Sequence, residues 1–338
     1  MNAPSSPLRR FTLFSRMGAE QRRLLANFLY DWRRFARHSF VFGARRRKHR
    51  AAMLHILAHS LEHGMSLPAP RPGFGHEKAA SLLTKVESYT SDFEVDASAR
   101  AAMKALDAWV DFHRRAGLDM SGFAERLDRL EESSSFRASD VAGGVELTTA
   151  AEIAQATDFD YRRFVRARHS VRQYAARPVG PETIREAVRD AQQCPSVCNR
   201  QTCRVYALTD REAIAEVLRH QSGNAGFGQE VAVLFIIVAD MQQLNLIGER
   251  YQGWIDGGIF AMSLALALHA RGLGACCLNW SVAADTDRRM RSLVGIPDNE
   301  LVITLMSAGY LKDDFAVPIS QRKPVEDILL LDPPLHRA

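Results

Sequence analysis

Three arginines and a serine stand close together between Arg166 and Arg172, where the sequence reads RARHSVR. In an extended segment alternate side chains point the same way, so Arg168, Ser170 and Arg172 would share one side. Two guanidinium groups and a hydroxyl on one side form a suitable clamp for a phosphate. The spacing therefore indicates a phosphate-binding segment, although clusters of arginine are also common on solvated surfaces.

A second polar segment, CPSVCNRQ from Cys194 to Gln201, stands immediately before a β-prone run. Asn199 and Gln201 carry side-chain amides, which donate and accept hydrogen bonds and suit a ring with mixed hydrogen-bonding edges. An ordinary turn between a helix and a strand is the alternative interpretation. Two further candidate segments are GLGACCLNWS, from Gly272, and SQRKP, from Ser320.

The chain around these segments alternates apolar, strand-like runs with helical patterns. The run VAVLFIIVAD, residues 231–240, is almost unbroken and ends in Asp, as expected of a strand buried on both faces. This alternation predicts a mixed α/β arrangement. The other expected strands cover 203–210, 275–280 and 301–310, and the expected helices cover 181–193, 211–220, 254–271 and 284–294.

The helical pattern at 254–271 is apolar enough to require a test for a membrane span. Asp256, Ser263 and His269 interrupt it, and the run is short for the ~20 residues that a span needs. We therefore expect a buried central helix, with Asp256 as its N-cap.

Residues 1–150 are expected to form an all-helical region in front of a domain over 151–338. Apolar residues recur there at spacings of three and four, and Ser133–Gly144 is rich in Ser and Gly, as in a linker. The expected helices cover 19–63, 76–89 and 98–116, and a further helix begins near Ala150.

The first fifty residues are strongly basic. They carry 13 Lys and Arg against two acidic residues, which gives +11, so the rest of the chain carries −6 of the total of +5. Phe28, Trp32 and Phe35 lie on an apolar stripe among these arginines. The pattern is typical of a helix packed on the protein's own core, or of a basic helix on an anionic membrane surface. No nucleic-acid-binding motif accompanies it, so we expect no nucleic-acid partner.

The cysteines and histidines do not predict a metal site. The five cysteines are odd in number, and no signal-peptide pattern precedes them, which favours a reducing, cytoplasmic location. Cys194 and Cys198 have a C-x3-C spacing rather than the C-x2-C usual for zinc. His55, His59 and His63 recur every four residues, a spacing compatible with metal ligation but more typical of a solvated or hydrogen-bonded helix face.

Taken in order, the polar segments resemble the nitroreductase family. RHSVRQY is similar to the family's opening pattern, CPSVCNRQ to its P-S-x-x-N-x-Q turn, IDGGIFAMSLALALHARGLGACCLNW to its central helix and next strand, and PISQRKPVEDIL to its closing segment. The resemblance covers roughly residues 161–338 and implies a nitroreductase-like α+β fold, with a central mixed sheet flanked by helices. In the N-terminal half, HSLEHGMSLPAPRPGFG resembles an extension seen on nitroreductase-like proteins associated with bacterial surface-polysaccharide synthesis.

The resemblance implies a homodimer with FMN at its interface, the turn before the first strand reaching the flavin of the partner subunit. The clamp and closing arginines would hold the phosphate and ribityl chain, Asn224 the pyrimidine edge, and the segment from Leu278 the ring near N5. FMN carries the chemistry, so no catalytic side chain is expected. The implied cofactor-binding residues are Arg168, His169, Ser170, Arg172, Pro195, Ser196, Asn199, Gln201, Asn224, Leu278, Asn279 and Arg322.

The implied activity is a ping-pong oxidoreductase. NAD(P)H would reduce FMN and leave, and a small quinone- or nitro-type acceptor would then take the electrons. The alternative is a flavin-binding module with weak or no turnover, acting with a membrane or polysaccharide-synthesis partner. The turn reads Gln201-Thr202-Cys203 where the family usually continues Q-P-W, and Asn279-Trp280 stands where many members carry Pro, Glu and Gly, so the substrate stays open.

Overall fold

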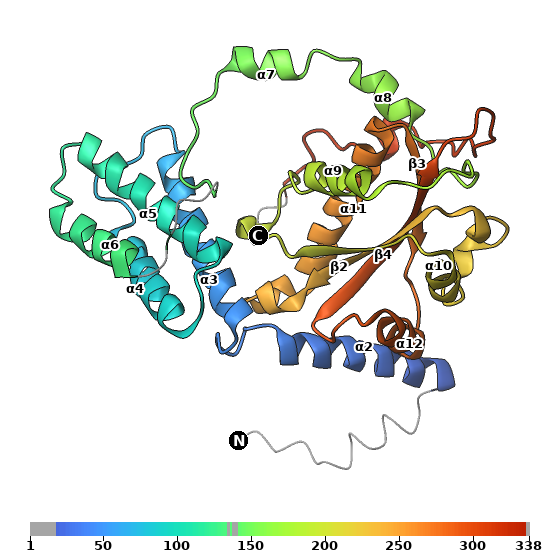
Figure 1. Ribbon diagram of the computed structural model, residues 1–338, viewed down its shortest axis with the longest axis horizontal. Helices are drawn as coiled ribbons and strands as arrows, with labels where there is room; N and C mark the ends of the chain where they lie inside the picture. Colours follow the sequence, from blue (N-terminus) through green and yellow to red (C-terminus); the bar gives the residue numbers. More distant parts are fainter. Residues whose placement is uncertain (1–17, 134–135, 137–140, 336–338) are drawn as a thin grey trace.

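A computed structural model describes residues 18–133, 136 and 141–335 of the chain. Its first part contains a lobe of packed helices, at the left of Figure 1. The lobe has a core of its own, in which Leu82, Leu106 and Trp109 are fully buried. The helical character expected of this region is confirmed. The helices of the lobe are α3 (Arg47–Met65), α4 (His76–Asp92), α5 (Ala97–Arg115) and α6 (Ser121–Ser133).

The single helix expected over 19–63 is two helices, so that prediction was wrong. The first, α2 (Ala19–His38), ends at a turn in which Gly43 has φ +117°, and α3 begins after it. The break depends on a distant contact: Phe40 is buried, and its N–H donates to the Leu244 carbonyl at 3.0 Å. The local periodicity of the sequence does not predict a contact between residues so far apart in the chain.

The second part is built on a four-stranded sheet in the order β1-β2-β4-β3, with antiparallel pairing between neighbouring strands. Every residue of β2 is buried, as its unbroken apolar run predicted. A parallel bridge between Ser170 and Ala275 adds a short segment beside β3. The strands are β1 (Cys203–Leu208), β2 (Val233–Asp240), β3 (Leu273–Asn279) and β4 (Glu300–Tyr310).

Helices cover both faces of the sheet (Figure 1). One face, with Val233, Phe235 and Ile237 of β2, packs against α9 (Pro181–Ala191) and α11 (Gln252–Ala270). The other face packs against α10 (Arg211–Leu218) and α12 (Ala284–Val294). This arrangement confirms the α+β class and places β3 at an edge of the sheet.

Within the described residues, one helical stretch, Ile247–Ala270, is long and apolar enough to cross a membrane, and half of its most apolar part is buried. It includes α11, which packs on the sheet as expected. Asp256 is not the N-cap of α11, because Tyr251 occupies that position. The carboxylate of Asp256 is buried instead and accepts hydrogen bonds from Gln252 and Thr202.

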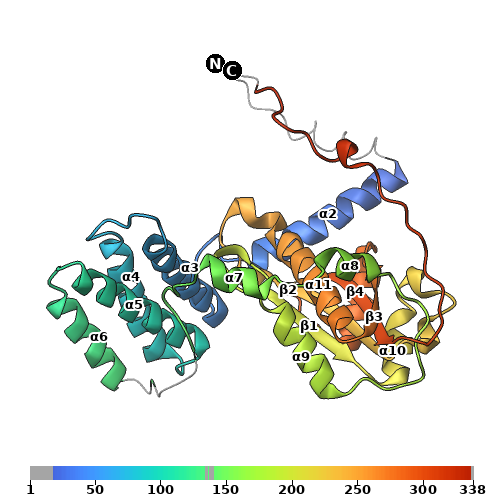
Figure 2. The same cartoon turned by 90° about the horizontal axis from the view of Figure 1, so that it is seen from above.

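Two segments link the parts of the molecule. In Figure 2, α2 lies beside the sheet domain rather than on the helical lobe. After the lobe, the chain crosses back through α7 (Ala150–Ala156) and α8 (Tyr161–Ala167) as an arch (Figure 1). None of the residues of α7 is buried.

Candidate functional site

The predicted phosphate clamp lies where α8 ends and the chain becomes extended. Arg168 is the C-cap of α8 with extended backbone angles, and the Val171 N–H donates to the Ala275 carbonyl at 3.1 Å. Ser170 bridges to the same residue of β3. The segment is therefore extended as the alternation required. Arg168 and His169 line a small cavity, of about 40 Å³, against the start of β3.

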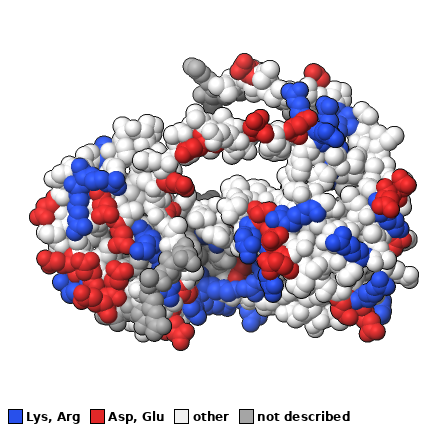
Figure 3. All heavy atoms as spheres, turned by 45° about the horizontal axis from the view of Figure 1, so that its top comes forward, with Lys and Arg blue, Asp and Glu red and all other residues white. Residues whose placement is uncertain are grey.

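The clamp arginines have no acidic partner among the described residues. Arg172 donates to the Ser170 carbonyl at 3.4 Å, and neither Arg172 nor Arg168 forms an ion pair within that part of the chain. The neighbouring α8 adds Arg162, Arg163 and Arg166, and Figure 3 shows basic side chains gathered near the end of the arch. Unneutralised guanidinium groups around an extended backbone fit an anionic group such as the phosphate of FMN.

The end of β3 meets the glycine-rich loop that follows α10. Gln221 is buried, and its Nε2 donates to the Asn279 carbonyl at 3.2 Å. Asn224 donates from Nδ2 to the Leu218 carbonyl at 2.8 Å, so its amide holds the loop itself. Leu278 is buried and Asn279 is exposed. Sequence reasoning missed Gln221, whose position before the loop gave no signal of the contact.

The turn from Pro195 to Gln201 has an unusual backbone. Cys198, Asn199 and Gln201 have φ of 48°, 49° and 50°, the left-handed region that side chains other than glycine rarely adopt. The Gln201 N–H donates to Ser196 Oγ at 2.9 Å, and Pro195 and Asn199 are exposed. Strained positions persist only where surrounding contacts impose them, and they gather at functional sites.

Arg200 supplies those contacts, and sequence reasoning missed it. Its side chain is fully buried, and its Nη2 lies 2.5 Å from Oε1 of Glu249. It also donates to the carbonyls of Gln243 at 2.6 Å and Val197 at 3.2 Å. Glu249 lies near the start of the long apolar helix, so the pairing follows from the tertiary fold.

A second anchor holds the same turn from α11. Asp256 Oδ2 accepts from Thr202 Oγ1 at 3.1 Å, and Asp256 Oδ1 accepts from the Val197 N–H at 3.4 Å. Pro195, Ser196 and Gln201 line a cavity of about 90 Å³ at this place. Burial raises the pKa of Cys203 beside it to about 12, so that thiol is neutral at physiological pH.

The two groups of predicted residues lie at opposite edges of the sheet. The turn precedes β1 and the clamp adjoins β3, and β2 and β4 separate these strands. Three strand spacings amount to about 14 Å. The turn and the clamp of one chain therefore do not lie next to each other. Arg322 lies apart from both, because it is exposed on the C-terminal tail and donates to the Ser320 carbonyl at 3.0 Å. Figure 2 shows this tail extending away from the sheet domain.

The histidines of α3 have neighbours in the helical lobe. His55 Nε2 lies 3.1 Å from Ser98 Oγ, and burial lowers the pKa of His55. His59 Nδ1 lies 3.7 Å from a carboxylate oxygen of Glu62. In the described part of the chain, no group of three or more His, Cys, Asp or Glu is placed to hold a metal ion.

The basic helix α2 meets the sheet domain with its polar face. Arg34 is buried and donates from Nη2 to the Glu300 carbonyl at 2.7 Å, whereas Leu24, Phe28 and Trp32 are about 60% exposed. Packing of the aromatic stripe on the protein's own core, one of the two interpretations of this helix, is therefore wrong for Phe28 and Trp32.

Comparisons with known proteins give one family match and several similar proteins. Residues 165–310 match the model of the nitroreductase family. An Archaeoglobus fulgidus protein named for NADH dehydrogenase or NAD(P)H nitroreductase activity is 28% identical over 156 residues, 45% of this chain and 86% of that protein. A Staphylococcus aureus NADPH-dependent oxidoreductase is 25% identical over 187 residues, 51% of this chain and 72% of its own. The solved structure of an FMN-dependent nitroreductase from Clostridium difficile is 22% identical, with a TM-score of 0.40. The match covers 46% of this chain and 91% of that one.

Proposed function

We propose that this chain, whose C-terminal half has a nitroreductase-like fold, is an NAD(P)H-dependent FMN oxidoreductase. The observation that carries the proposal is the pair of unneutralised arginines, Arg168 and Arg172, on an extended segment with Ser170 beside β3. The family match over 165–310 and the names of the relatives support the same chemistry.

The residues of the chain bind and orient the cofactor, and FMN, when bound, supplies the hydride chemistry. Arg168, Ser170 and Arg172 hold its phosphate, with His169 contributing mainly backbone. Leu278 and Asn279 would line the ring, and Asn224, whose Nδ2 holds the loop, would offer its Oδ1 to the pyrimidine edge. Arg322, which is exposed on the C-terminal tail in this structure, would join the clamp in the FMN-bound protein. No side chain of this set needs to gain or lose a proton.

A homodimer completes the site in this proposal. The strained turn, with Pro195, Ser196, Asn199 and Gln201, lies on the far edge of the sheet from its own clamp, so it serves the flavin of the second copy. The exposed apolar side of α11, which includes Ile255, Ile259 and Met262, supplies a surface that a second copy can bury. The C-terminal tail adds a second exposed apolar surface, formed by Ile328, Leu329, Leu330 and Leu331.

The reaction is ping-pong. FMN, when bound, would supply the hydride chemistry that links NAD(P)H as the reductant to a small quinone- or nitro-type acceptor as the oxidant.

The test is the flavin content of purified protein. Denaturation should release about one FMN per chain, and Arg168→Ala should weaken FMN binding roughly tenfold to a hundredfold, as expected for loss of a charge-assisted hydrogen bond. Arg185→Ala, an exposed arginine of α9, is the matched control and should leave binding unchanged. A protein that stays colourless after incubation with FMN would exclude the proposal.

A second function is favoured by one observation, the exposure of Phe28 and Trp32 on a helix rich in arginine. Aromatic and basic side chains on one helix suit an anionic membrane surface, and each basic residue near it contributes about 1 kcal/mol. The cytoplasmic protein would then bind a membrane peripherally, next to a polysaccharide-synthesis partner of the kind that the N-terminal resemblance implies.

Vesicle sedimentation tests this binding. Full-length protein should sediment with anionic vesicles at low salt and be released at high salt. Phe28→Ser with Trp32→Ser should remain in solution while the bound FMN is retained. If the variant and the natural protein sedimented equally, membrane binding through Phe28 and Trp32 would be excluded. Deletion of residues 1–50 is a poor variant, because Arg34 of α2 is part of the packing of the sheet domain.

A further inference from the structure

A cavity of about 370 Å³ lies between the helical lobe and the sheet domain. Helix α3 forms its lobe side, with Arg47, Lys48 and Ala51, and the start of β1 forms the opposite side, with Gln201 and Arg204. The volume is in the range of pockets that hold small molecules. The N-terminal region therefore builds one wall of a cavity whose other wall belongs to the oxidoreductase fold.

The cavity adjoins the strained turn. Gln201, whose φ is 50°, lines it, and α3 contacts the turn at η1 (Val197–Asn199). Gln201 also lines the smaller cavity that contains Pro195 and Ser196, so it is common to both. In the proposed function this turn serves the flavin of the second copy, and the present inference rests on that function. A substrate on that flavin therefore has the larger cavity beside it.

The acidic groups of the cavity are already committed to hydrogen bonds. Asp96 is the N-cap of α5, and two backbone N–H groups of that helix donate to its Oδ1 at 3.0 and 3.1 Å. Its Oδ2 accepts from Tyr89 at 2.6 Å and from Arg47 at 3.0 Å. Asp240 is buried, and it accepts from Lys48 at 2.5 Å and from two other residues. Little acceptor capacity is left in the walls.

The basic groups keep donors for a ligand. Arg47, Lys48 and Arg204 line the cavity, and their side chains are each about half exposed. Arg47 donates from Nε and Nη2, and its Nη1 makes no hydrogen bond within the described part of the chain. Arg204 pairs through Nη1 with Glu300, which lies outside the lining. A guanidinium or ammonium group has more N–H donors than one such contact uses, so the cavity suits a ligand that brings acceptor oxygens.

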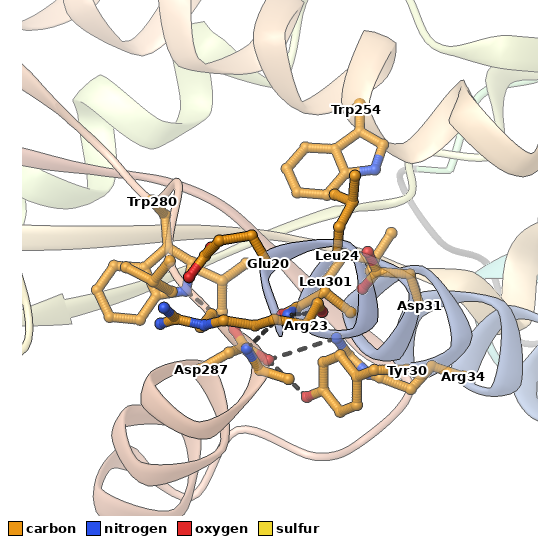
Figure 4. Close-up of a pocket in the computed structure, with 15 residues that line it drawn as sticks. Glu20, Arg23, Leu24, Tyr30, Asp31, Arg34, Trp254, Trp280, Asp287 and Leu301 are labelled. Carbon is orange, nitrogen blue, oxygen red and sulfur yellow. Dashed lines mark hydrogen bonds and ion pairs between the residues drawn. The ribbon is translucent and has the colours of Figure 1, made fainter. Parts of the chain in front are cut away.

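The cavity between α2 and the sheet domain is a poorer place for such a ligand (Figure 4). Arg34 is paired there with Asp287 at 3.5 Å, and none of the lining belongs to the turn or the clamp. Acidic side chains outnumber basic ones among the charged lining residues, which are Glu20, Asp31, Asp287, Arg23 and Arg34.

A phosphate monoester has the chemistry that the cavity beside the turn requires. It carries up to about two negative charges at neutral pH and several acceptor oxygens. FMN and NADPH both contain such a group, whereas NADH does not. The FMN phosphate is assigned to the clamp, at the opposite edge of the sheet from the turn. The 2′-phosphate of NADPH remains, and arginine is a residue that accommodates it in other dinucleotide sites.

We propose that this cavity binds the 2′-phosphate of an NADPH whose nicotinamide lies on the flavin of the second copy. The helical lobe of one copy then selects NADPH over NADH for the active site of the other, and Arg47 contacts the phosphate. The N-terminal region is, on this account, part of the dinucleotide site.

Calorimetry on FMN-loaded protein, in which the clamp is filled, tests the site itself. Natural protein should bind 2′,5′-ADP, which carries the 2′-phosphate, at least tenfold more tightly than 5′-AMP, which lacks it. Arg47→Gln should weaken 2′,5′-ADP binding at least tenfold, the usual effect of losing a hydrogen bond to a charged group. Arg50→Gln is the matched control and should change nothing, because Arg50 lies on the same helix, pairs with Asp92 and does not line the cavity.

A charge placed in the cavity tests the sign of the effect without breaking an ion pair. Ala51 lines the cavity, and Ala51→Glu and Ala51→Gln introduce side chains of the same size that differ in charge. Ala51→Glu should bind 2′,5′-ADP at least tenfold more weakly than Ala51→Gln. In turnover, Arg47→Gln should raise KM for NADPH at least tenfold and leave kcat and KM for NADH unchanged.

Four results separate the inference from the proposed function. Equal binding of 2′,5′-ADP and 5′-AMP by natural protein overturns the inference, and so does equal binding of 2′,5′-ADP by the two Ala51 variants. Binding of inorganic phosphate without binding of 2′,5′-ADP also overturns it. A protein that binds 2′,5′-ADP but whose flavin neither nicotinamide bleaches overturns the proposed function instead, since this binding requires no electron transfer.

Discussion

The buried ion pair between Arg200 and Glu249 allows a quantitative test of how the strained turn is held. Glu249→Gln keeps the shape of the side chain and removes its charge. The guanidinium of Arg200 would remain fully buried and would lose its ionic partner, which lies 2.5 Å away in the natural protein. Breaking a buried pair in this way typically costs about 3–5 kcal/mol.

The lower end of that range is expected here, because Arg200 keeps its hydrogen bonds to the carbonyls of Gln243 and Val197. We therefore predict a loss of about 3 kcal/mol in the free energy of unfolding. The turn should also relax, since its left-handed residues cost about 1–3 kcal/mol each and need the anchor. In a dimer whose turns contact the partner's flavin, FMN would dissociate faster.

Urea unfolding of the FMN-loaded protein measures the first effect, and flavin fluorescence on dilution measures the second. The control is Glu216→Gln, which removes an exposed partner of Arg219 and should cost less than 1 kcal/mol. The double variant Arg200→Met with Glu249→Leu should be less destabilised than Glu249→Gln, because no unpaired buried charge remains. Equal midpoints for Glu249→Gln and Glu216→Gln would refute the reasoning.

Three further outcomes are expected. Burial opposes ionisation of Glu249, but hydrogen bonds from Arg200 and from backbone amides outweigh it and hold its pKa below the usual value. Glu249 therefore stabilises the folded protein above its unfolded pKa of about 4.3, and this stabilisation is lost as the pH falls through the lower folded pKa. The urea midpoints of natural protein and of Glu249→Gln should consequently converge in acid. Arg322→Ala and Arg172→Ala should each weaken FMN binding by about 1.5–3 kcal/mol in a titration of apo-protein. An unchanged dissociation constant would show that the substituted arginine does not bind FMN. Ile259→Arg on the exposed side of α11 should give a monomer mass in light scattering, and an intact dimer would place the interface elsewhere.

The sequence predicted those parts of the fold that depend on local pattern. The buried strand β2 and the extended clamp around Ser170 follow from residue types and spacing. Much of the linker expected over Ser133–Gly144 lies outside the described residues. The order of the polar segments indicated the candidate site residues, which the structure places at two edges of the sheet and on the C-terminal tail.

The parts that the sequence did not predict depend on contacts between distant residues. The break between α2 and α3 is stabilised by a hydrogen bond from Phe40 to Leu244, and the anchor of the turn is the pairing of Arg200 with Glu249. Amphipathic periodicity also placed the wrong face of α2 on the protein, because Arg34 is buried by hydrogen bonding and not by apolar packing. Pattern analysis ranks residues by polarity and does not register such satisfied buried charges.

The central claim is that this chain holds FMN and passes electrons through it. The most direct measurement is an anaerobic absorbance titration of purified, FMN-loaded protein. NADPH or NADH should bleach the flavin band near 450 nm with about one nicotinamide per flavin, and menadione added afterwards should restore the band in full. A flavin band that neither nicotinamide bleaches would contradict the oxidoreductase and leave a flavin-binding module in its place.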